Sequence, residues 1–398
     1  MTTTVPADVF AALTSPDARR DPYPTHAAYR TEMPLLDTGL GLWFVFGFHD
    51  CLALLRSSRT SVDERHATIP GPPKPDEPPT LIHLDPPDHD RLRRLVQVAF
   101  TPRRVEGLRH RATEIVTETL DRFGPDDEVD VIQELAYPMP LTIICELLDI
   151  DPSERDLVRE WSTWMARSID PGVFRSPELN DRIELAEREF SEFVRDGIER
   201  RRRRPGDDLL SQLVTTELDG DRLSEDELVG LAVLLLVAGH ETTVNLIGNG
   251  LHALLRHPDQ LAAVAGGATP DRRMIDELLR FDAPVQMTSR VTLDPIELPS
   301  GTIPKGQVAI VLLGSANHDP SVFVRPDELD VNLEREAAHL AFGNGIHFCL
   351  GAALARAEGE IALGELVRRF PRMQLAAEPP LRPTFVLRGR EELRVRLS

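Results

Sequence analysis

Cysteine is scarce in this chain of 398 residues. The three cysteines, Cys51, Cys145 and Cys349, lie far apart, and none belongs to a Cys-x-x-Cys pair. A disulfide framework or a structural zinc site needs closely spaced cysteines, so the sequence predicts neither. Few cysteines also fit a reducing compartment, and we expect a cytoplasmic protein.

Long apolar runs and an excess of basic charge are also missing. The longest apolar run, Leu231 to Gly239, is far shorter than the roughly 20 residues that cross a bilayer. Residues 1–19 lack a basic segment followed by an apolar stretch, so we expect neither a signal peptide nor a membrane span. The formal net charge of −20 argues against a general nucleic-acid-binding surface.

The last cysteine stands in a glycine-rich loop, Phe342-Gly-Asn-Gly-Ile-His-Phe-Cys-Leu-Gly351. Residues 350–370 have alanine and leucine at helical spacing, so we expect Cys349 at or just before a helix N-terminus. The N–H groups and the dipole at such an end favour a thiolate over a thiol. Gly343, Gly345 and Gly351 remove side chains where a flat, bulky ligand could approach.

This loop resembles the haem-binding loop of the cytochrome P-450 family, the haem-thiolate monooxygenases, in its soluble bacterial class. The resemblance implies haem b as the cofactor and Cys349 as the axial ligand of its iron. It also implies that His347 hydrogen-bonds a haem propionate. Phe342, Gly343 and Gly351 are then part of the cofactor-binding loop.

A second polar motif follows the helix start Asp85-Pro-Pro-Asp88, where Asp85 can cap the helix and proline suits its first turn. His89 and Arg93 are four residues apart and share one helix face. Such a pair is more often solvated than functional. The resemblance implies instead that both residues contact haem propionates, as Arg290 does on a later strand.

A third motif interrupts an apolar helix. Ser224 and the acids after it predict a helix start, and the all-round apolar stretch 228–237 predicts a helix buried through the core. The segment Ala238-Gly-His-Glu-Thr-Thr243 either marks the exit from the core or, as it resembles the family's oxygen-activation motif, serves the reaction. In the second case Thr242 joins the hydrogen-bond network around dioxygen, Glu241 supplies protons and Gly239 leaves room for oxygen.

Glu277 and Arg280, at i and i+3, resemble the family's structural Glu-x-x-Arg pair, which holds the core behind the cysteine loop. Many members carry an arginine three residues after the aspartate that matches Asp330, where this chain has Leu333. Arg335 is the nearest candidate to complete this network. Its different spacing leaves the assignment open.

The resemblance implies one cytochrome P-450 domain over residues 1–398, mainly α with small β-sheets. The haem is expected between the long oxygen-activation helix and the cysteine-loop helix. The β-rich parts are predicted at about 30–60 and 290–315, from a hairpin at 35–46, strands at 298–306 and a strand at 308–313. Residues 57–81, rich in proline, are expected to form a long loop over the substrate pocket or a mere connector, and 385–395 a final hairpin.

The implied reaction inserts one atom of O₂ into a small apolar organic substrate, usually by hydroxylation. Leu234, Val237, Ala238, Val285 and Met287 are expected to line an apolar pocket. Two alternatives remain open: an H₂O₂-driven peroxygenase, and a non-enzymatic haem sensor or carrier.

Electrons are expected from an external ferredoxin and an NAD(P)H-dependent reductase, because the chain has no room for a flavin or iron–sulfur domain. Residues 91–111 contain seven arginines and one acid. This basic segment is either a solvated helix face or a docking site for an acidic redox partner. We expect a monomer.

Overall fold

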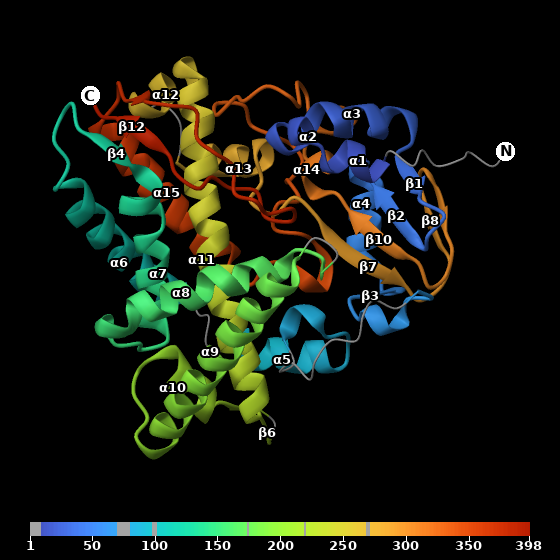
Figure 1. Ribbon diagram of the computed structural model, residues 1–398, viewed down its shortest axis with the longest axis horizontal. Helices are drawn as coiled ribbons and strands as arrows, with labels where there is room; N and C mark the ends of the chain where they lie inside the picture. Colours follow the sequence, from blue (N-terminus) through green and yellow to red (C-terminus); the bar gives the residue numbers. More distant parts are fainter. Residues whose placement is uncertain (1–8, 70–79, 98–101, 173–174, 219, 268–270) are drawn as a thin grey trace. The chain divides into compact units, whose positions relative to one another are not determined.

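The computed structural model describes residues 9–69, 80–97, 102–172, 175–218, 220–267 and 271–398 (Figure 1). The chain divides into two compact units. The first unit comprises residues 1–73, 252–349 and 381–389, and the second comprises 74–251, 350–380 and 390–398. Each unit is therefore built from segments that are distant in sequence.

The first unit contains a five-stranded sheet in the order β1-β2-β10-β7-β3. The predicted hairpin is present, because β1 pairs antiparallel with β2, with Leu36 opposite Phe44. Strand β10 runs parallel to β2 and antiparallel to β7, and β8 pairs with β9 as the predicted strand-turn-strand. The strands are β1 (Leu35–Asp37), β2 (Leu42–Val45), β3 (Thr60–Ser61), β7 (Thr288–Thr292), β8 (Ile296–Leu298), β9 (Gly301–Ile303) and β10 (Val308–Val311).

Helices pack on this sheet through an apolar core that includes Val45, Leu54, Val311 and Phe323. Burying these aliphatic and aromatic side chains contributes roughly 1.5–3 kcal/mol each. The helices of the first unit are α1 (Val9–Thr14), α2 (Pro16–Arg20), α3 (Tyr23–Glu32), α4 (Phe48–Arg56), α12 (Pro258–Ala265), α13 (Asp271–Phe281) and α14 (Leu313–Ala316).

Two sequence predictions about irregular segments need correction. The predicted loop at 57–81 contains strand β3, which pairs with β7, and the short 3₁₀ helix Glu64–His66; residues 70–79 lie outside the described residues. The predicted hairpin at 385–395 is displaced toward the N-terminus. The Arg382 N–H donates to the Gly389 carbonyl and the Glu391 N–H to the Pro380 carbonyl, both at 3.0 Å, so the chain turns back between residues 382 and 389. Leu387 makes one antiparallel bridge with Val285, and β12 (Arg394–Arg396) pairs with β11 (Gln374–Leu375) and β4 (Glu128–Asp130). A two-residue period cannot tell a local hairpin from pairing with distant strands.

The long helix α11 (Glu225–Arg256) dominates the second unit, and its last turn belongs to the first. The helix begins with the predicted Ser224 cap, and Ser224 and Glu227 hydrogen-bond each other's backbone N–H. The Glu227 N–H donates to Ser224 Oγ at 3.2 Å, and the Ser224 N–H donates to Glu227 Oε2 at 2.8 Å. An added Cβ at Gly248 would lie 2.6 Å from Ile132 Cδ1, so glycine permits the close approach of the π-helical turn Ile132–Ala136.

By length and composition α11 could cross a membrane, but 61% of its most apolar stretch is buried inside the protein. Core helices of soluble proteins pass the same test, so this helix is weak evidence for a span. Helix α15 packs along α6 in the same unit. The other elements of this unit are α5 (Asp88–Gln97), α6 (Pro102–Leu120), α7 (Pro138–Leu147), α8 (Arg155–Met165), α9 (Pro177–Arg203), α10 (Leu209–Thr215), β5 (Glu217–Leu218), β6 (Asp221–Arg222) and α15 (Ala352–Arg369).

Candidate functional site

The loop before Cys349 is closed by backbone hydrogen bonds in the first unit. The Cys349 N–H donates to the Phe342 carbonyl at 3.0 Å, and the Phe348 N–H donates to the Gly345 carbonyl at 3.1 Å. Gly343 and Gly345 have φ angles of 67° and 71°, which favour glycine. Cys349 lies three residues before the first residue of α15, which confirms its predicted place at a helix N-terminus.

Gly345 is required by the protein itself rather than by a ligand. An added Cβ there would lie 2.1 Å from the carbonyl oxygen of Leu55, at the end of α4. Next to it, Arg56 Nε donates to Asn344 Oδ1 at 2.8 Å and fixes the loop on α4. Gly351 differs: an added Cβ would meet no atom within 4 Å, so that side of the loop is open.

The three cysteines differ in their environment. Cys51 and Cys145 are buried; burial raises the pKa of the Cys51 thiol far above its usual range and that of Cys145 to about 12. Buried thiols of this kind are inert. Cys349 is only half-buried. Cys349 is therefore the most accessible of the three cysteines, as its predicted role as a haem thiolate ligand requires.

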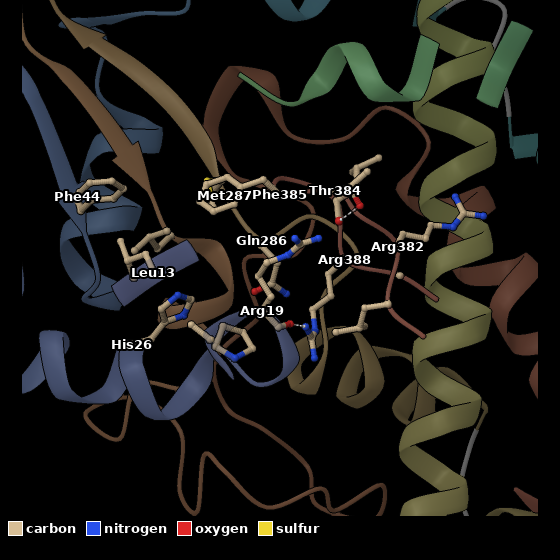
Figure 2. A pocket seen from close by; sticks show the side chains of 16 residues that line it. Leu13, Arg19, His26, Phe44, Gln286, Met287, Arg382, Thr384, Phe385 and Arg388 are labelled. Atoms are coloured by element: carbon tan, nitrogen blue, oxygen red, sulfur yellow. Dashed lines mark hydrogen bonds between the residues drawn. The ribbon is translucent and has the colours of Figure 1, made fainter. Parts of the chain in front are cut away.

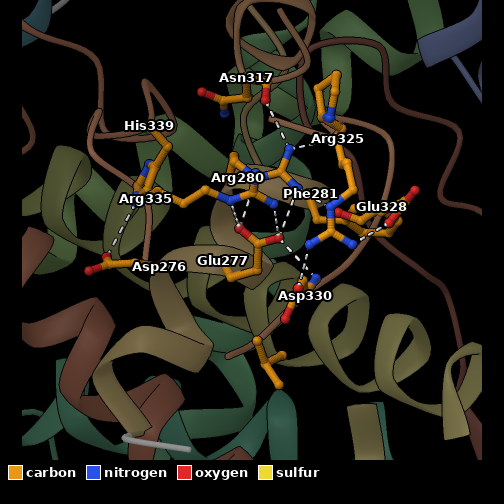
Figure 3. A network of polar contacts seen from close by, with 12 residues as sticks. Asp276, Glu277, Arg280, Phe281, Asn317, Arg325, Glu328, Asp330, Arg335 and His339 are labelled. Carbon is orange, nitrogen blue, oxygen red and sulfur yellow. Dashed lines mark hydrogen bonds and ion pairs between the residues drawn. The ribbon is translucent and has the colours of Figure 1, made fainter. Parts of the chain in front are cut away.

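Glu277 and Arg280 lie at the centre of a buried network in the first unit (Figure 3). Arg280 donates to both carboxylate oxygens of Glu277 at 2.8 Å. Arg335 also donates to both, at 3.1 and 2.7 Å, and so completes the network that the sequence left open. Burial alone would raise the pKa of Glu277, but the bonds from the two arginines outweigh it and hold this pKa below its ordinary value.

A chain of hydrogen bonds joins this network to the cysteine loop. Arg280 donates to the Asn317 carbonyl at 3.1 Å, and Asn317 Oδ1 accepts from the Leu340 N–H at 2.7 Å. The Leu340 carbonyl in turn accepts from the Gly343 N–H at 2.8 Å. The network thus supports the backbone that carries Cys349.

In the second unit, residues 228–237 of α11 are buried or half-buried, in line with the sequence prediction, and the helix opens just after them, at Ala238. Leu234, Ala238 and Thr242, spaced by four residues, are half-buried or exposed, whereas Val237 and Glu241 beside them are buried. This spacing defines one open stripe along a core helix. Thr242 Oγ1 donates to the Ala238 carbonyl at 2.6 Å. Gly239 approaches Ile144 of α7, because an added Cβ would be 3.3 Å from its Cδ1.

Glu241 is 1% exposed, so its carboxylate has no direct access to bulk water. His240 is equally buried, with Nδ1 3.9 Å from Glu241 Oε1 and 3.0 Å from Ser162 Oγ on α8. The ring of Tyr137 packs edge-on against the imidazole at 4.3 Å. Sequence reasoning missed Ser162 and Tyr137, because nothing local in their segments marks them as polar neighbours of α11.

The residues expected near haem propionates are also divided between the units. His89 on α5 is buried in the second unit, with Nδ1 2.9 Å from Asp90 Oδ1, and Arg93 follows one turn later. Arg290 on β7 is buried in the first unit and donates to the Ser289 carbonyl at 2.7 Å. The first unit thus holds Val285, Met287, Arg290, Phe342, Gly343, His347 and Cys349; the second holds His89, Arg93, Leu234, Val237, Ala238, Gly239, Glu241, Thr242 and Gly351.

A pocket of about 60 Å³ opens within the first unit (Figure 2). Leu13, Phe44, Met287 and Phe385 give it an apolar side. Of the five residues predicted to line an apolar substrate pocket, Met287 lines this one, whereas Leu234, Val237, Ala238 and Val285 do not. The lining residues lie at 13–26, 44, 286–287, 312 and 381–389, so no local sequence pattern could have united them.

Gln286 is one of several polar residues that line this pocket. Its Nε2 donates to the Ala283 carbonyl at 2.7 Å and to the Tyr23 hydroxyl at 3.3 Å. Tyr23 donates in turn to Asp282 at 2.9 Å, and Arg388 Nε donates to the same carboxylate at 2.7 Å. This network fixes the walls of the pocket, and a sequence reading could not detect it.

Comparison with known proteins identifies the family. The sequence model of cytochrome P-450 matches residues 53–265 and 272–391. Cytochrome P-450 107B1 of Saccharopolyspora erythraea is 42% identical over 90% of each chain, and the same organism's 6-deoxyerythronolide B hydroxylase is 38% identical over 95% of this chain and 96% of that protein. The ligand-free crystal structure of Mycobacterium smegmatis CYP164A2 matches with a TM-score of 0.90 at 38% identity, over 98% and 99% of the two chains.

The chain belongs to the cytochrome P-450 family, in its bacterial type. It is a cytochrome P-450 monooxygenase, and the mainly helical fold with small sheets that the sequence predicted is confirmed. Membership in this family implies a haem cofactor.

Proposed function

We propose that this enzyme uses haem b to insert one atom of O₂ into an apolar organic substrate, with hydroxylation as the usual outcome. The observation that carries the proposal is the half-buried Cys349 in its closed glycine loop, whereas the chain's two other cysteines are buried and inert. When bound there, a haem with a thiolate ligand supplies dioxygen activation. Cys349 would hold the iron, and His347, Arg290, His89 and Arg93 would hold the propionates.

The open stripe of α11 supports the proposed oxygen and substrate side. Leu234 and Ala238 present only apolar groups, whereas the Thr242 hydroxyl can donate one hydrogen bond and accept others. Glu241 is the proposed proton store for this hydroxyl. Because Glu241 is buried, we propose that protons reach it through neighbouring polar groups, of which His240 Nδ1 lies 3.9 Å from Glu241 Oε1.

The proposed substrate class is a small apolar organic molecule. The apolar side of the pocket around Met287 and Phe385 supports this. Val285 and Val237 remain proposed substrate contacts outside this pocket. One relative is named as a 6-deoxyerythronolide B hydroxylase, which supports hydroxylation as the reaction. At 38% identity the pocket residues are free to differ, so the named substrate is not carried over.

A ferredoxin with an NAD(P)H-dependent reductase is the proposed electron source, and a cytoplasmic monomer the proposed state. The basic segment 91–111 offers less free charge than its sequence indicates. Arg91 pairs with Asp221 and Glu227, Arg109 pairs with Glu360 at 2.7 Å, and Arg111 pairs with Glu146 at 3.0 Å. The exposed Arg94 is then the best-placed described side chain for an acidic partner.

Replacing Cys349 with serine tests the proposal. We expect loss of the red-shifted Soret band that marks thiolate ligation in the reduced CO complex, whereas Cys145→Ser should keep it. Survival of that band in Cys349→Ser would overturn the ligand assignment. Turnover with O₂ and ferredoxin, with H₂O₂ alone, and with neither separates a monooxygenase from a peroxygenase and from a carrier.

A further inference from the structure

A buried carboxyl group lies between two helices of the second unit and has no place in the function proposed above. Glu358 on α15 is 3% exposed and hydrogen-bonds the hydroxyl of Thr243 on α11. Burial raises its pKa to about 8, and the Thr243 hydrogen bond lowers it by a smaller amount. At neutral pH the side chain is therefore mostly the neutral acid.

The hydrogen bonds that Thr243 makes depend on the proton of the Glu358 carboxyl group. Thr243 Oγ1 lies 3.1 Å from the Gly239 carbonyl oxygen, to which it donates. A hydroxyl has one hydrogen, and a protonated carboxyl is a donor. The neutral acid can thus donate to Thr243 while Thr243 donates to Gly239, and every group is satisfied. An ionised carboxylate only accepts, so Thr243 must turn its hydrogen toward Glu358 and release the Gly239 carbonyl.

Thr242 and Thr243 each donate to the carbonyl four residues earlier, on Ala238 and Gly239. Hydroxyl bonds of this kind bend helices locally. The bend falls on the turn 238–243, which contains the open end of the stripe and Thr242. A change in the direction of one hydroxyl therefore acts on the backbone that places the other.

We propose that Glu358 is a positioning residue for the Thr242 turn of α11, and that loss of its proton redirects the Thr243 hydroxyl away from the Gly239 carbonyl. The proton leaves to solvent, and the hydroxyl hydrogen stays on Thr243. The hydrogen-bond change stands independently of the proposed function. Only its effect on oxygen use depends on that function.

Other titratable groups near these helices are held in their own contacts. On α6, Arg109 pairs with Glu360 of α15 at 2.7 Å, and Asp121 just beyond α6 pairs with Arg369. On α11, His240 and Glu241 are the nearest titratable residues in sequence, and His240 lies 3.0 Å from Ser162. Burial and the Thr243 hydroxyl are the causes that act on Glu358.

Infrared difference spectra of the holoenzyme between pH 6 and pH 10 test the proton directly, since this range brackets about 8. We expect a protonated-carboxyl band at neutral pH that disappears through about pH 8 and is absent in Glu358→Gln. In Thr243→Val the midpoint should move upward, because the hydroxyl that favours the ionised form is gone. Glu365→Gln, a more exposed position on the same helix, is the matched control and should match the wild type.

Hydrogen exchange of the amides 239–243 over the same pH range tests the positioning role. We expect exchange in the wild type to rise less steeply through about pH 8 than its chemical rate, because release of the Thr243 bond to the Gly239 carbonyl relaxes the bend. In Glu358→Gln, whose amide always donates to Thr243, exchange should follow the chemical rate alone. If the wild-type infrared spectrum is identical to that of Glu358→Gln, Glu358 is not protonated at neutral pH. If wild-type amide exchange shows no step, Glu358 does not position the Thr242 turn. If Glu358→Gln fails to fold, the wild-type step and the Thr243→Val shift still decide. Loss of product coupling above pH 8 would link the step to the proposed reaction, and its absence would leave only that link refuted.

Discussion

Arg335→Leu should destabilise the first unit through Glu277, although Arg335 is remote from Glu277 and Arg280 in sequence. Its guanidinium gives two hydrogen bonds to the Glu277 carboxylate, at 3.1 and 2.7 Å, and its side chain is only 12% exposed. After the substitution Glu277 keeps Arg280 and the Asp330 N–H, at 3.1 Å. The Glu277 carboxylate thus loses two hydrogen bonds and keeps those from Arg280 and the Asp330 N–H.

The magnitude follows from that difference. Hydrogen bonds to a charged group contribute about 1.5–3 kcal/mol net, so we expect Arg335→Leu to lower the free energy of unfolding by about 2–3 kcal/mol. Arg280→Leu removes the main partner of a buried charge and should lower it by about 3–5 kcal/mol. Because Arg280 also binds the Asn317 carbonyl, its loss should further disturb the cysteine loop.

The effect should depend on pH with a definite sign. The pKa of Glu277 is held below its ordinary value of about 4.3, so its contribution is present above that pH and is lost as the pH falls through the folded-state value. Removing Arg335 raises the folded-state pKa. The difference in unfolding free energy between wild type and variant should therefore be full at neutral pH and shrink on acidification.

Urea unfolding followed by circular dichroism at pH 7 and near pH 4 measures both quantities. Arg325→Leu is the matched control, because Arg325 lies beside the network (Figure 3) but makes exposed ion pairs with Glu328 and Asp330. We expect little change in that control. If Arg335→Leu is no less stable than Arg325→Leu at pH 7, Arg335 does not hold Glu277 in solution and the reasoning fails.

Two further substitutions test the oxygen side and the cysteine loop. Thr242→Ala should keep haem binding and NAD(P)H consumption but divert electrons from product to H₂O₂, because the hydroxyl on the open stripe of α11 is lost; unchanged ratios of NAD(P)H, product and peroxide would make Thr242 a packing residue. Gly345→Ala should cost several kcal/mol of stability or prevent haem retention, since its Cβ would lie 2.1 Å from the Leu55 carbonyl at a φ of 71°. Gly39→Ala is the matched control, because Gly39 has a φ of 70° but an added Cβ there would meet no atom within 4 Å; equal soluble, haem-loaded yields for both variants would contradict the assignment.

The sequence predicted those features that depend on short, local patterns. The capping box at Ser224, the β1–β2 hairpin and the place of Cys349 before α15 each follow from residues within a few positions of one another. Such patterns act through neighbouring backbone groups, so they need no knowledge of the fold. The role of each residue in the haem site came instead from family resemblance.

Contacts between distant segments could not be predicted, and they account for the errors. The basic segment 91–111 was read as an accessible charge, yet its partners Glu227, Glu146 and Glu360 stand 35 or more residues away in sequence. The same limit hid Glu358, which reads locally as one more charge in a helix with Glu360 and Glu365. Only the packing of α15 against α6 and the contact with Thr243 of α11 make it a buried acid with a pKa of about 8 rather than a solvated carboxylate. A helix whose apolar and charged residues do not separate cleanly into two faces is therefore a reason to ask which of its charges the fold has buried, because those charges must find a partner or a proton.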